Sequence, residues 1–253
     1  MPHLRPFSLL TPQPKPRPSE RITLPDLRQL KYRGTSQYLD SLAARIDAPR
    51  LGDIDIAFLN QHLPMELHQL GQFINLTTMH ESHRRADIIF SKRAISISFT
   101  QPESSTCLEL QVPCKSFSQQ LSHLTRICEC LYLLLPGIEH LRVCATRNDS
   151  GHESHDYKDR EEWQKVLLFF RGKKWAYIAC GLSTDTIISL LRSRQRPKLF
   201  PALHKLYIQE PGPLWQEAIV SFIHSRLLSG HIIAVEYERL RINELHRTGT
   251  GFF

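Results

Sequence analysis

The sequence has no long apolar run, which excludes a membrane-spanning helix. Its longest apolar stretch, Leu131 to Leu135, is far shorter than the roughly 20 residues that such a helix needs. Prolines also interrupt residues 1–21, where a secretory signal peptide would need a continuous apolar segment. We therefore predict a soluble protein of the cytoplasm or nucleus that has no membrane partner.

Signatures of disulfides, catalysis and cofactors are also missing. The six cysteines have no C-x-x-C spacing and mostly lie in apolar runs, which is typical of reduced core thiols. The chain contains no G-x-S-x-G, no glycine-rich phosphate loop and no cysteine signature of a nucleophile. We predict a protein that is not an enzyme and has no cofactor. A hydrolase is the least favoured function, and it is kept because a catalytic triad is recognised by its geometry rather than by its order in the chain.

Histidine spacing gives one candidate metal site. HESH occurs at 80–83 and 152–155, and His152, His155 and Asp156 could supply three ligands. The second tract lies in a polar loop predicted at about 147–159, and short histidine tracts match easily by chance. Because HExxH spacing is also absent, we predict no bound metal.

One short phrase occurs five times, as MPHLRPFSL, LPDLRQLKY, APRLGDIDI, LPGIEHLRV and FPALHKLYI. Each copy has a proline, a Leu or Ile two residues later, and then two apolar residues at alternate positions. Alternation is typical of a half-buried strand, and the proline disfavours a helix in the preceding residue. The phrase therefore predicts a strand that begins shortly after a proline, and this unit is repeated through the chain.

Helical periodicity fills the segments between the strands. Ser36 is a candidate cap for a helix whose apolar residues Leu39, Leu42, Ala43 and Ile46 keep i, i+3, i+4, i+7 spacing. The other predicted helices are 64–74, 116–135, 160–170, 183–193 and 213–230, the last with Pro213 in its first turn and Gly230 past its end. The other predicted strands are 85–90, 94–99, 108–112, 175–180 and 231–238. Strands joined by helical crossovers are expected to run parallel.

The composition of the strands distinguishes between α/β folds. Strands covered on both faces are almost continuously apolar, whereas Lys31 and Arg33 alternate here with apolar residues, as do Asp53 and Asp55. We predict that residues 1–253 form a single α/β domain, a leucine-rich-repeat-like solenoid. Such a solenoid is a horseshoe with a parallel sheet on its concave face and helices outside. A proline-rich connector is expected at about 11–23.

Positive charge exceeds negative charge. Lys and Arg number 32 and Asp and Glu 25, giving a formal net charge of +7 and a pI near 9.2. This balance permits binding to nucleic-acid phosphates, but the basic clusters fall in predicted loops or at helix ends. These clusters are residues 14–21, 83–85, 171–174 and 192–198. A basic nucleic-acid-associated solenoid scaffold is therefore the second alternative, favoured only if the basic loops converge on one face.

The order of the segments resembles that of a known family. LPDLRQLKYRGTSQYLDSLAARIDAPRLGDIDIAFLNQ, LELQVPCKSFSQQLSHLTRIC, EEWQKVLLFFRG and FPALHKLYIQEPGPLWQEAIVSFIHSRLLSGHIIAVEY follow one another. They resemble the C-terminal leucine-rich-repeat-like region of F-box-like proteins of mushroom-forming fungi. The resemblance runs from about residue 1 to Tyr237, and YLDSLAARIDAPRL is its most specific piece. It implies a noncatalytic arm that recognises a protein substrate for a ubiquitin ligase.

Two features depart from that family. Its members usually carry an N-terminal F-box that docks the adaptor of a cullin-RING ubiquitin ligase. The only phrase of that type, LPMEL at 63–67, lies between predicted strands, without the helices that should follow. We expect either a truncated sequence or a paralogue without ligase docking, so the adaptor is a partner only if an F-box is supplied elsewhere. In KKWAYIA, Lys173 and Ala176 occupy positions that the pattern reserves for larger apolar residues, which predicts weak packing.

The predicted exposed face carries the candidate partner-binding residues. Solenoids bind partners on concave surfaces, and exposed Trp, Tyr and Arg contribute much of the energy at interfaces, so Trp175 and Tyr177 are the strongest candidates. The alternative is that basic residues of the second phrase only pair with Asp53 and Asp55, at about 0.2 to 1 kcal/mol per pair. The full candidate set is Lys31, Arg33, Asp53, Asp55, Glu109, His140, Arg142, Trp175, Tyr177, Lys205 and Tyr207.

Overall fold

The computed structural model describes most of the chain, namely residues 21–59, 65, 67–77, 83–101, 107–146, 157–170, 172–178, 201–209, 213–228 and 230–238. Several predictions lie outside these residues. They are the first repeated phrase, the helix at 183–193, the histidine tracts apart from His83, the basic cluster at 192–198, and most of the connector and the polar loop.

The described elements form an α/β fold. The strands are β1 (Ile22–Thr23), β2 (Gln29–Gly34), β3 (Ile46–Asp47), β4 (Asp53–Phe58), β5 (Arg85–Ser91), β6 (Ala94–Thr100), β7 (Cys107–Pro113), β8 (His140–Ala145), β9 (Trp175–Ile178), β10 (Lys205–Gln209) and β11 (Ala234–Glu238). The helices are α1 (Ser36–Ala43), α2 (His68–Asn75), α3 (Phe117–Cys130), α4 (Tyr157–Phe169) and α6 (Pro213–Leu228). Nine strands form one open, mostly parallel sheet in the order β11-β10-β9-β8-β5-β6-β7-β4-β2, and β1 pairs with β3.

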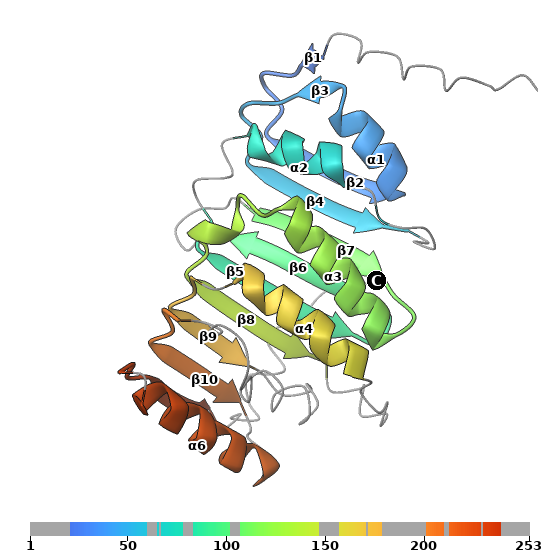
Figure 1. Cartoon of the computed structure of the whole chain (residues 1–253). Coiled ribbons are helices and arrows are strands. Elements are labelled where there is room, and N and C mark those ends of the chain that lie inside the picture. Colours follow the sequence, from blue (N-terminus) through green and yellow to red (C-terminus); the bar gives the residue numbers. More distant parts are fainter. Residues whose placement is uncertain are drawn as a thin grey trace, which may run out of the picture.

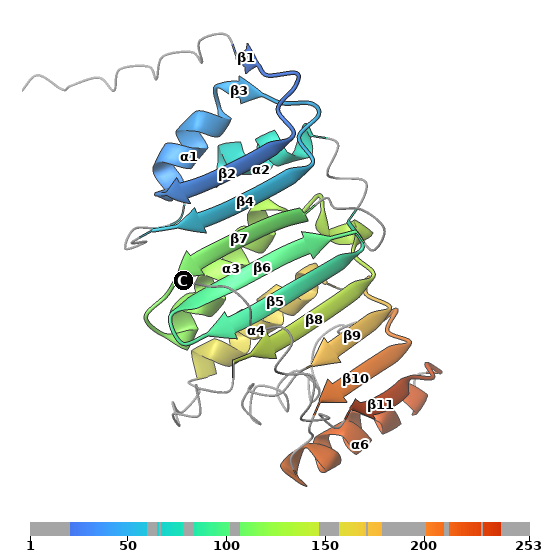
Figure 2. The same ribbon diagram turned by 180° about the vertical axis from the view of Figure 1, so that it is seen from behind.

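The described α-helices all lie on one face of the nine-stranded sheet. Figure 1 shows them in front of the strands, and Figure 2 shows the opposite face of the sheet from behind. Side chains that point toward the helices, such as Ile54, Ile88 and Leu110, are almost completely buried. We call the opposite face, which no described helix covers, the open face. None of the described helices combines the length and the apolar composition needed to cross a bilayer.

Four of the five repeated phrases are described, and each leads into a strand, as predicted. The strands are β2, β4, β8 and β10. Leu51, Ile138 and Leu203, the first apolar residues of three phrases, are at most 2% exposed and anchor the turns in the core. Asp53 N donates to Arg28 O at 3.1 Å, where the parallel pairing of β2 with β4 begins. The phrase therefore fixes both the turn and the start of the ladder.

The centre of the sheet breaks the predicted succession of parallel strands. β6 is antiparallel to both β5 and β7. Between β4 and β5 the chain skips two positions in the sheet, and β6 and β7 occupy these positions. α3 carries the chain from β7 to β8, which lies beside β5 (Figure 1). The prediction of helical crossovers between all strands is wrong here, because the two-residue link Lys92–Arg93 between β5 and β6 allows only a hairpin.

The first helix differs from its prediction at both ends. Thr35 holds the N-cap position, so Ser36 is not the cap; it is the first helical residue and is buried. The helix ends at Ala43, and Ile46 belongs to β3 instead. Ile46 is nevertheless buried, because β3 pairs with β1 at this edge of the fold. The i+7 spacing of Ile46 therefore reflects burial rather than continuation of the helix.

The other helix boundaries agree with the predictions in part. α3 ends at Cys130 rather than at residue 135, and Leu135–Gly137 forms a separate 3-10 turn. α2 (His68–Asn75) lies within the predicted helix 64–74 except for its last residue. α6 begins at Pro213, and Gly230 adopts a left-handed φ of 77° past its end, as predicted.

Lys173 occupies a buried position that corresponds to Leu203 in the next phrase. Lys173 and Ala176 are 0% and 4% exposed, so the unit is packed, contrary to the prediction. The Lys173 ammonium donates hydrogen bonds to the carbonyls of Leu135 and Ile138, in the turn of the preceding phrase. Its stem thus fills an apolar position while its ammonium satisfies main-chain acceptors. Burial lowers the pKa of Lys173 to about 8.

Candidate interaction surface

Rows of side chains cross the open face, because strand pairing aligns alternate positions of neighbouring strands. From β2 to β11, one row is Gln29, Asp53, Cys107, Thr100, Arg85, His140, Trp175, Lys205 and Ala234. The next row is Lys31, Asp55, Glu109, Ser98, Asp87, Arg142, Tyr177, Tyr207 and Glu236. Arg33 lies in a third row. The structure therefore places all eleven predicted site residues on the same face.

The part of the open face over β4 and β7 is acidic. Asp53 and Asp55 are two residues apart on β4, and Asp55 lies directly opposite Glu109 of β7. Burial raises the pKa of Glu109, and the neighbouring charges of Asp55 and Asp53 raise it further. We call these three residues the acidic zone. Because their negative charges are close together, the zone favours a cationic group of a partner.

The predicted charge pairs between β2 and β4 are only partly aligned. Lys31 lies opposite Asp55, but Arg33 lies opposite Ala57. Asp53 accepts a hydrogen bond from the amide of Gln29 instead. Among the described residues, no ion pair joins β2 to β4. The cross-strand position of Lys31 opposite Asp55 therefore agrees with the pairing alternative, and that of Arg33 opposite Ala57 does not.

The part of the open face over β8, β9 and β10 is aromatic. The rings of Trp175 and Tyr207 are stacked, with centroids 6.2 Å apart and planes inclined by 17°. His140 lies 5.3 Å from Trp175, and Tyr177 lies 6.3 Å from Tyr207, again between ring centroids. We call these four residues the aromatic zone. Trp175 is 36% exposed, so the zone presents ring surface to solvent.

Two cations lie over the aromatic zone. Lys205 Nζ is 4.7 Å from the ring centroid of Tyr207 and 5.4 Å from that of Trp175. The guanidinium carbon of Arg142 is 5.4 Å from the ring centroid of Tyr177. These distances lie within the range of about 6 Å in which a cation is attracted to a ring face. The contacts hold the rings and the cations together as one surface.

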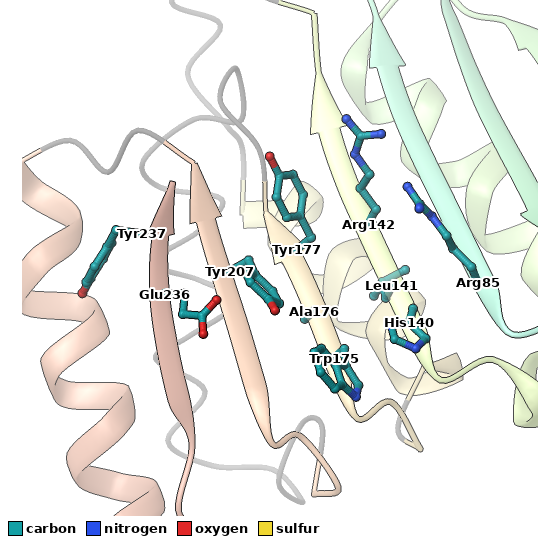
Figure 3. Close-up of a pocket in the computed structure, with 10 residues that line it drawn as sticks. All are labelled: Arg85, His140, Leu141, Arg142, Trp175, Ala176, Tyr177, Tyr207, Glu236 and Tyr237. Carbon is teal, nitrogen blue, oxygen red and sulfur yellow. The ribbon is translucent and has the colours of Figure 1, made fainter. Parts of the chain in front are cut away.

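A pocket of about 580 Å³ opens on the aromatic zone. Figure 3 shows its lining residues, which come from β5, β8, β9, β10 and β11. They are Arg85, His140, Leu141, Arg142, Trp175, Ala176, Tyr177, Tyr207, Glu236 and Tyr237. The volume is within the range of about 300 to 1,000 Å³ that is usual for ligand pockets. Of the charged lining residues, the sequence-based prediction missed Arg85 and Glu236.

Both missed residues have a physical explanation. Arg85 was counted in the basic cluster 83–85, although it also begins the predicted strand 85–90. It begins β5, which the crossover through α3 places beside β8. Glu236 lies on the last described strand, where it faces Tyr207. Its position in the alternation of 231–238 was the only signal that could have identified it. The pocket therefore depends on strand order, which alternation alone does not give.

Two of the cations around the pocket are paired with carboxylates. Arg85 Nε donates to both carboxylate oxygens of Asp87 at 3.0 Å. Lys205 Nζ is 2.5 Å from Glu236 Oε1, and this hydrogen bond raises the pKa of Lys205. Within the described part of the chain, Arg142 has no ion-pair partner.

The acidic zone adjoins a cysteine, and its carboxylates bear on metal binding and on the reactivity of that thiol. Across the described ranges, no group of three or more His, Cys, Asp or Glu residues is placed to hold a metal ion. Cys107 lies beside the acidic zone, and burial raises the pKa of its thiol to about 11, with further contributions from the carboxylates of Glu109 and Asp53. Such a thiol is almost entirely protonated at neutral pH and is a poor nucleophile.

We expect Cys107 to react slowly with iodoacetamide. Raising the thiol pKa from 9.0 to about 11 lowers the thiolate fraction about 100-fold, and greater thiolate nucleophilicity restores part of the rate. The rate at pH 7.5 should therefore be roughly 10-fold below that of free cysteine. Timed labelling followed by peptide mass spectrometry measures it. Labelling of Cys107 as fast as free cysteine would contradict this expectation, and the double variant Asp53→Asn, Asp55→Asn should label faster than the wild type.

Comparison with known proteins identifies no relative. No family model matches the chain, and no curated protein or solved structure matches it.

Proposed function

We propose that the protein is a noncatalytic protein-interaction module that binds a protein partner on the open face of its sheet. The observation that carries this proposal is the aromatic zone, which combines exposed ring surface with a pocket on a face that no described helix covers. Trp, Tyr and Arg are the residues that most often dominate binding energy at protein interfaces. Their concentration on three adjacent strands supports a binding role.

The charge of the open face supports a protein rather than a nucleic acid as the partner. The acidic zone lies on the same face as the cations, and Asp87 and Glu236 lie among those cations. A phosphate backbone that crossed the sheet would therefore meet repulsive carboxylates. Two basic clusters of the sequence are also partly buried, since His83 and Lys173 are almost inaccessible.

We further propose that the sheet belongs to a leucine-rich-repeat-like horseshoe with the open face on its concave side. The four described repeated phrases and the regular parallel succession from β8 to β11 support this interpretation. By the resemblance to fungal F-box-like proteins, the chain would be the substrate-recognition arm of a ubiquitin-ligase receptor. A ligase adaptor would join it only through an F-box supplied elsewhere.

Affinity capture from a fungal extract tests the proposal. Proteins held by the tagged wild type should be recovered at least about 10-fold less by the double variant Trp175→Ala, Tyr177→Ala, because loss of interface anchors usually costs more than 1 kcal/mol each. Tyr132→Ala is the matched control. Tyr132 is an exposed aromatic residue in the turn after α3, so this variant should retain the captured proteins.

Two results would contradict the proposal. One is capture of the same proteins by the wild type and the folded double variant. The other is recovery of nuclease-sensitive RNA or DNA that does not depend on Trp175 or Tyr177, which would favour the nucleic-acid-associated scaffold.

A further inference from the structure

The pocket over the aromatic zone has one positive charge in excess. Its lining includes Arg85, Arg142 and Glu236. Asp87 pairs with Arg85 and Lys205 pairs with Glu236, so the lining residues and their ion-pair partners are three cations and two anions. Arg85 and Lys205 are held by those carboxylates. The excess charge therefore belongs to Arg142, which has no acidic partner among the residues that the structure describes.

The contact between Arg142 and Tyr177 leaves the guanidinium able to bind a ligand. The guanidinium carbon lies over the ring, 5.4 Å from its centroid. A cation–π contact uses the charge of the guanidinium rather than its N–H groups, and no hydrogen bond joins these N–H groups to another described residue, so they remain available. Two parallel N–H groups on one edge match the two oxygens of a carboxylate. Figure 3 shows the side chain rising from β8 beside Tyr177.

The surrounding charges favour a carboxylate over a phosphate. A single carboxylate neutralises the excess charge of one. A phosphate monoester carries about −1.5 to −2 and would lie close to Asp87, which is the cross-strand neighbour of Arg142. Glu236 adds a second negative charge in the same pocket. Like charges in this arrangement weaken binding of a dianion.

The stacked rings beside Arg142 suit an apolar neighbour of that carboxylate. Trp175 lies on β9 and Tyr207 on β10, one and two strands from Arg142 on β8. Neighbouring strands are about 4.8 Å apart, so these rings lie roughly 5 to 10 Å from Arg142 across the sheet. An extended peptide rises about 3.3 Å per residue and covers that distance in two or three residues.

We propose that the pocket binds an Asp or Glu side chain of the partner protein. The carboxylate is held by both N–H groups of one edge of Arg142, and an apolar or aromatic residue two or three positions away lies on Trp175 and Tyr207. The inference rests on the proposed function and specifies what the open face recognises. The acidic zone, three to four strands from β8 and therefore roughly 15 to 20 Å away, is placed to meet basic residues of the same partner.

Peptide selection on the full chain tests the inference. A random 12-residue phage-displayed library is selected on the wild type and counter-selected on Arg142→Gln. Peptides that depend on Arg142 should share an Asp or Glu with an apolar residue two or three positions away. By fluorescence anisotropy, Arg142→Gln should weaken a selected peptide at least 10-fold, and Arg142→Lys should weaken it less, since the ammonium keeps the charge without the paired N–H groups.

A double-mutant cycle separates recognition from a structural effect. Replacing the acidic residue of the peptide by its amide should weaken binding to the wild type as much as Arg142→Gln does, with little further loss when both changes are combined. Arg126→Gln, at an exposed arginine of α3 on the other side of the sheet, should change the affinity less than twofold.

The outcomes distinguish this inference from the proposed function. Selected peptides that need Trp175 but no carboxylate, or that are rich in Lys and Arg, would overturn the inference while the proposed function stands. Stronger binding of a phosphopeptide or of an oligouridylate, dependent on Arg142, would overturn it in favour of a phosphate ligand. If no selected peptide and no captured protein depends on the open face, both fail.

Discussion

Replacing Trp163 by alanine is expected to lower the free energy of unfolding by about 3 to 5 kcal/mol. Trp163 lies on α4, is 2% exposed, and packs against Phe90 of β5 and Phe117 of α3 with ring centroids 5.2 and 6.2 Å apart. Phe90 and Phe117 are themselves 5.3 Å apart, so the three rings form one cluster. Alanine would leave a cavity where two helices meet the centre of the sheet, and tight packing allows little collapse around it.

Urea denaturation followed by circular dichroism measures this loss, and two variants control it. Trp163→Phe should lose less than about 1.5 kcal/mol, because it keeps an aromatic ring in the cluster. It also removes an indole N–H for which the described residues offer no hydrogen-bond acceptor. Trp175→Ala, on the open face, should lose only about 1 kcal/mol, the value of a partly exposed ring contact. Equal losses for Trp163→Ala and Trp175→Ala would contradict our separation of core from binding surface.

The sequence could predict which residues of a strand are buried, but not the position of every strand in the sheet. Alternation identified the strands because one face is buried, and a shift of one residue would expose every apolar side chain. The position of β5 between β6 and β8 was not predictable, because parallel and antiparallel strands that are buried on one face show the same alternation. Only the length of the link at Lys92–Arg93 distinguished them.

The end of α3 shows a second limit of periodicity. Leu131, Leu134 and Leu135 are buried although α3 ends at Cys130, because the turn that follows keeps them against the core. A turn with a repeat of three to four residues gives the same apolar spacing as a helix. The sequence therefore predicts which residues are buried better than it predicts where the helix ends.

The candidate site was predictable residue by residue but not as an assembly. The alternation of each strand identified Trp175, Tyr177 and Tyr207 as residues of the exposed face. The stack of Trp175 on Tyr207 depends on the register of β9 with β10, and the charge of the pocket depends on Arg85 and Glu236 from distant parts of the chain. Register and crossover geometry are properties of the fold, so composition gave the residue types and topology gave the pocket.

Replacing Lys173 by methionine is expected to remove a contribution to the free energy of unfolding that increases with pH. Burial lowers the pKa of Lys173 from 10.5 to about 8, so the folded protein loses this proton near pH 8 while the unfolded chain keeps it up to about 10.5. Between these values the unfolded state binds more protons, and the contribution of Lys173 to stability increases with pH. With 1.36 kcal/mol per pKa unit, the full increase is about 3 kcal/mol.

The buried thiols change the free energy of unfolding with pH in the opposite direction, so the test compares the wild type with a variant. Burial raises the pKa of Cys107 and Cys114 to about 11 and that of Cys130 to about 12, and their contribution to stability falls as the pH rises above about 9. Lys173→Met leaves these thiols in place, so the free energy of unfolding of the wild type minus that of the variant isolates Lys173. Urea denaturation at pH 7, 8, 9 and 10 should give a difference that increases with pH, and by more than the difference for Lys174→Met, which removes a half-exposed lysine beside it. A difference that stays constant across this range would mean that the ammonium of Lys173 is not buried against the carbonyls of Leu135 and Ile138.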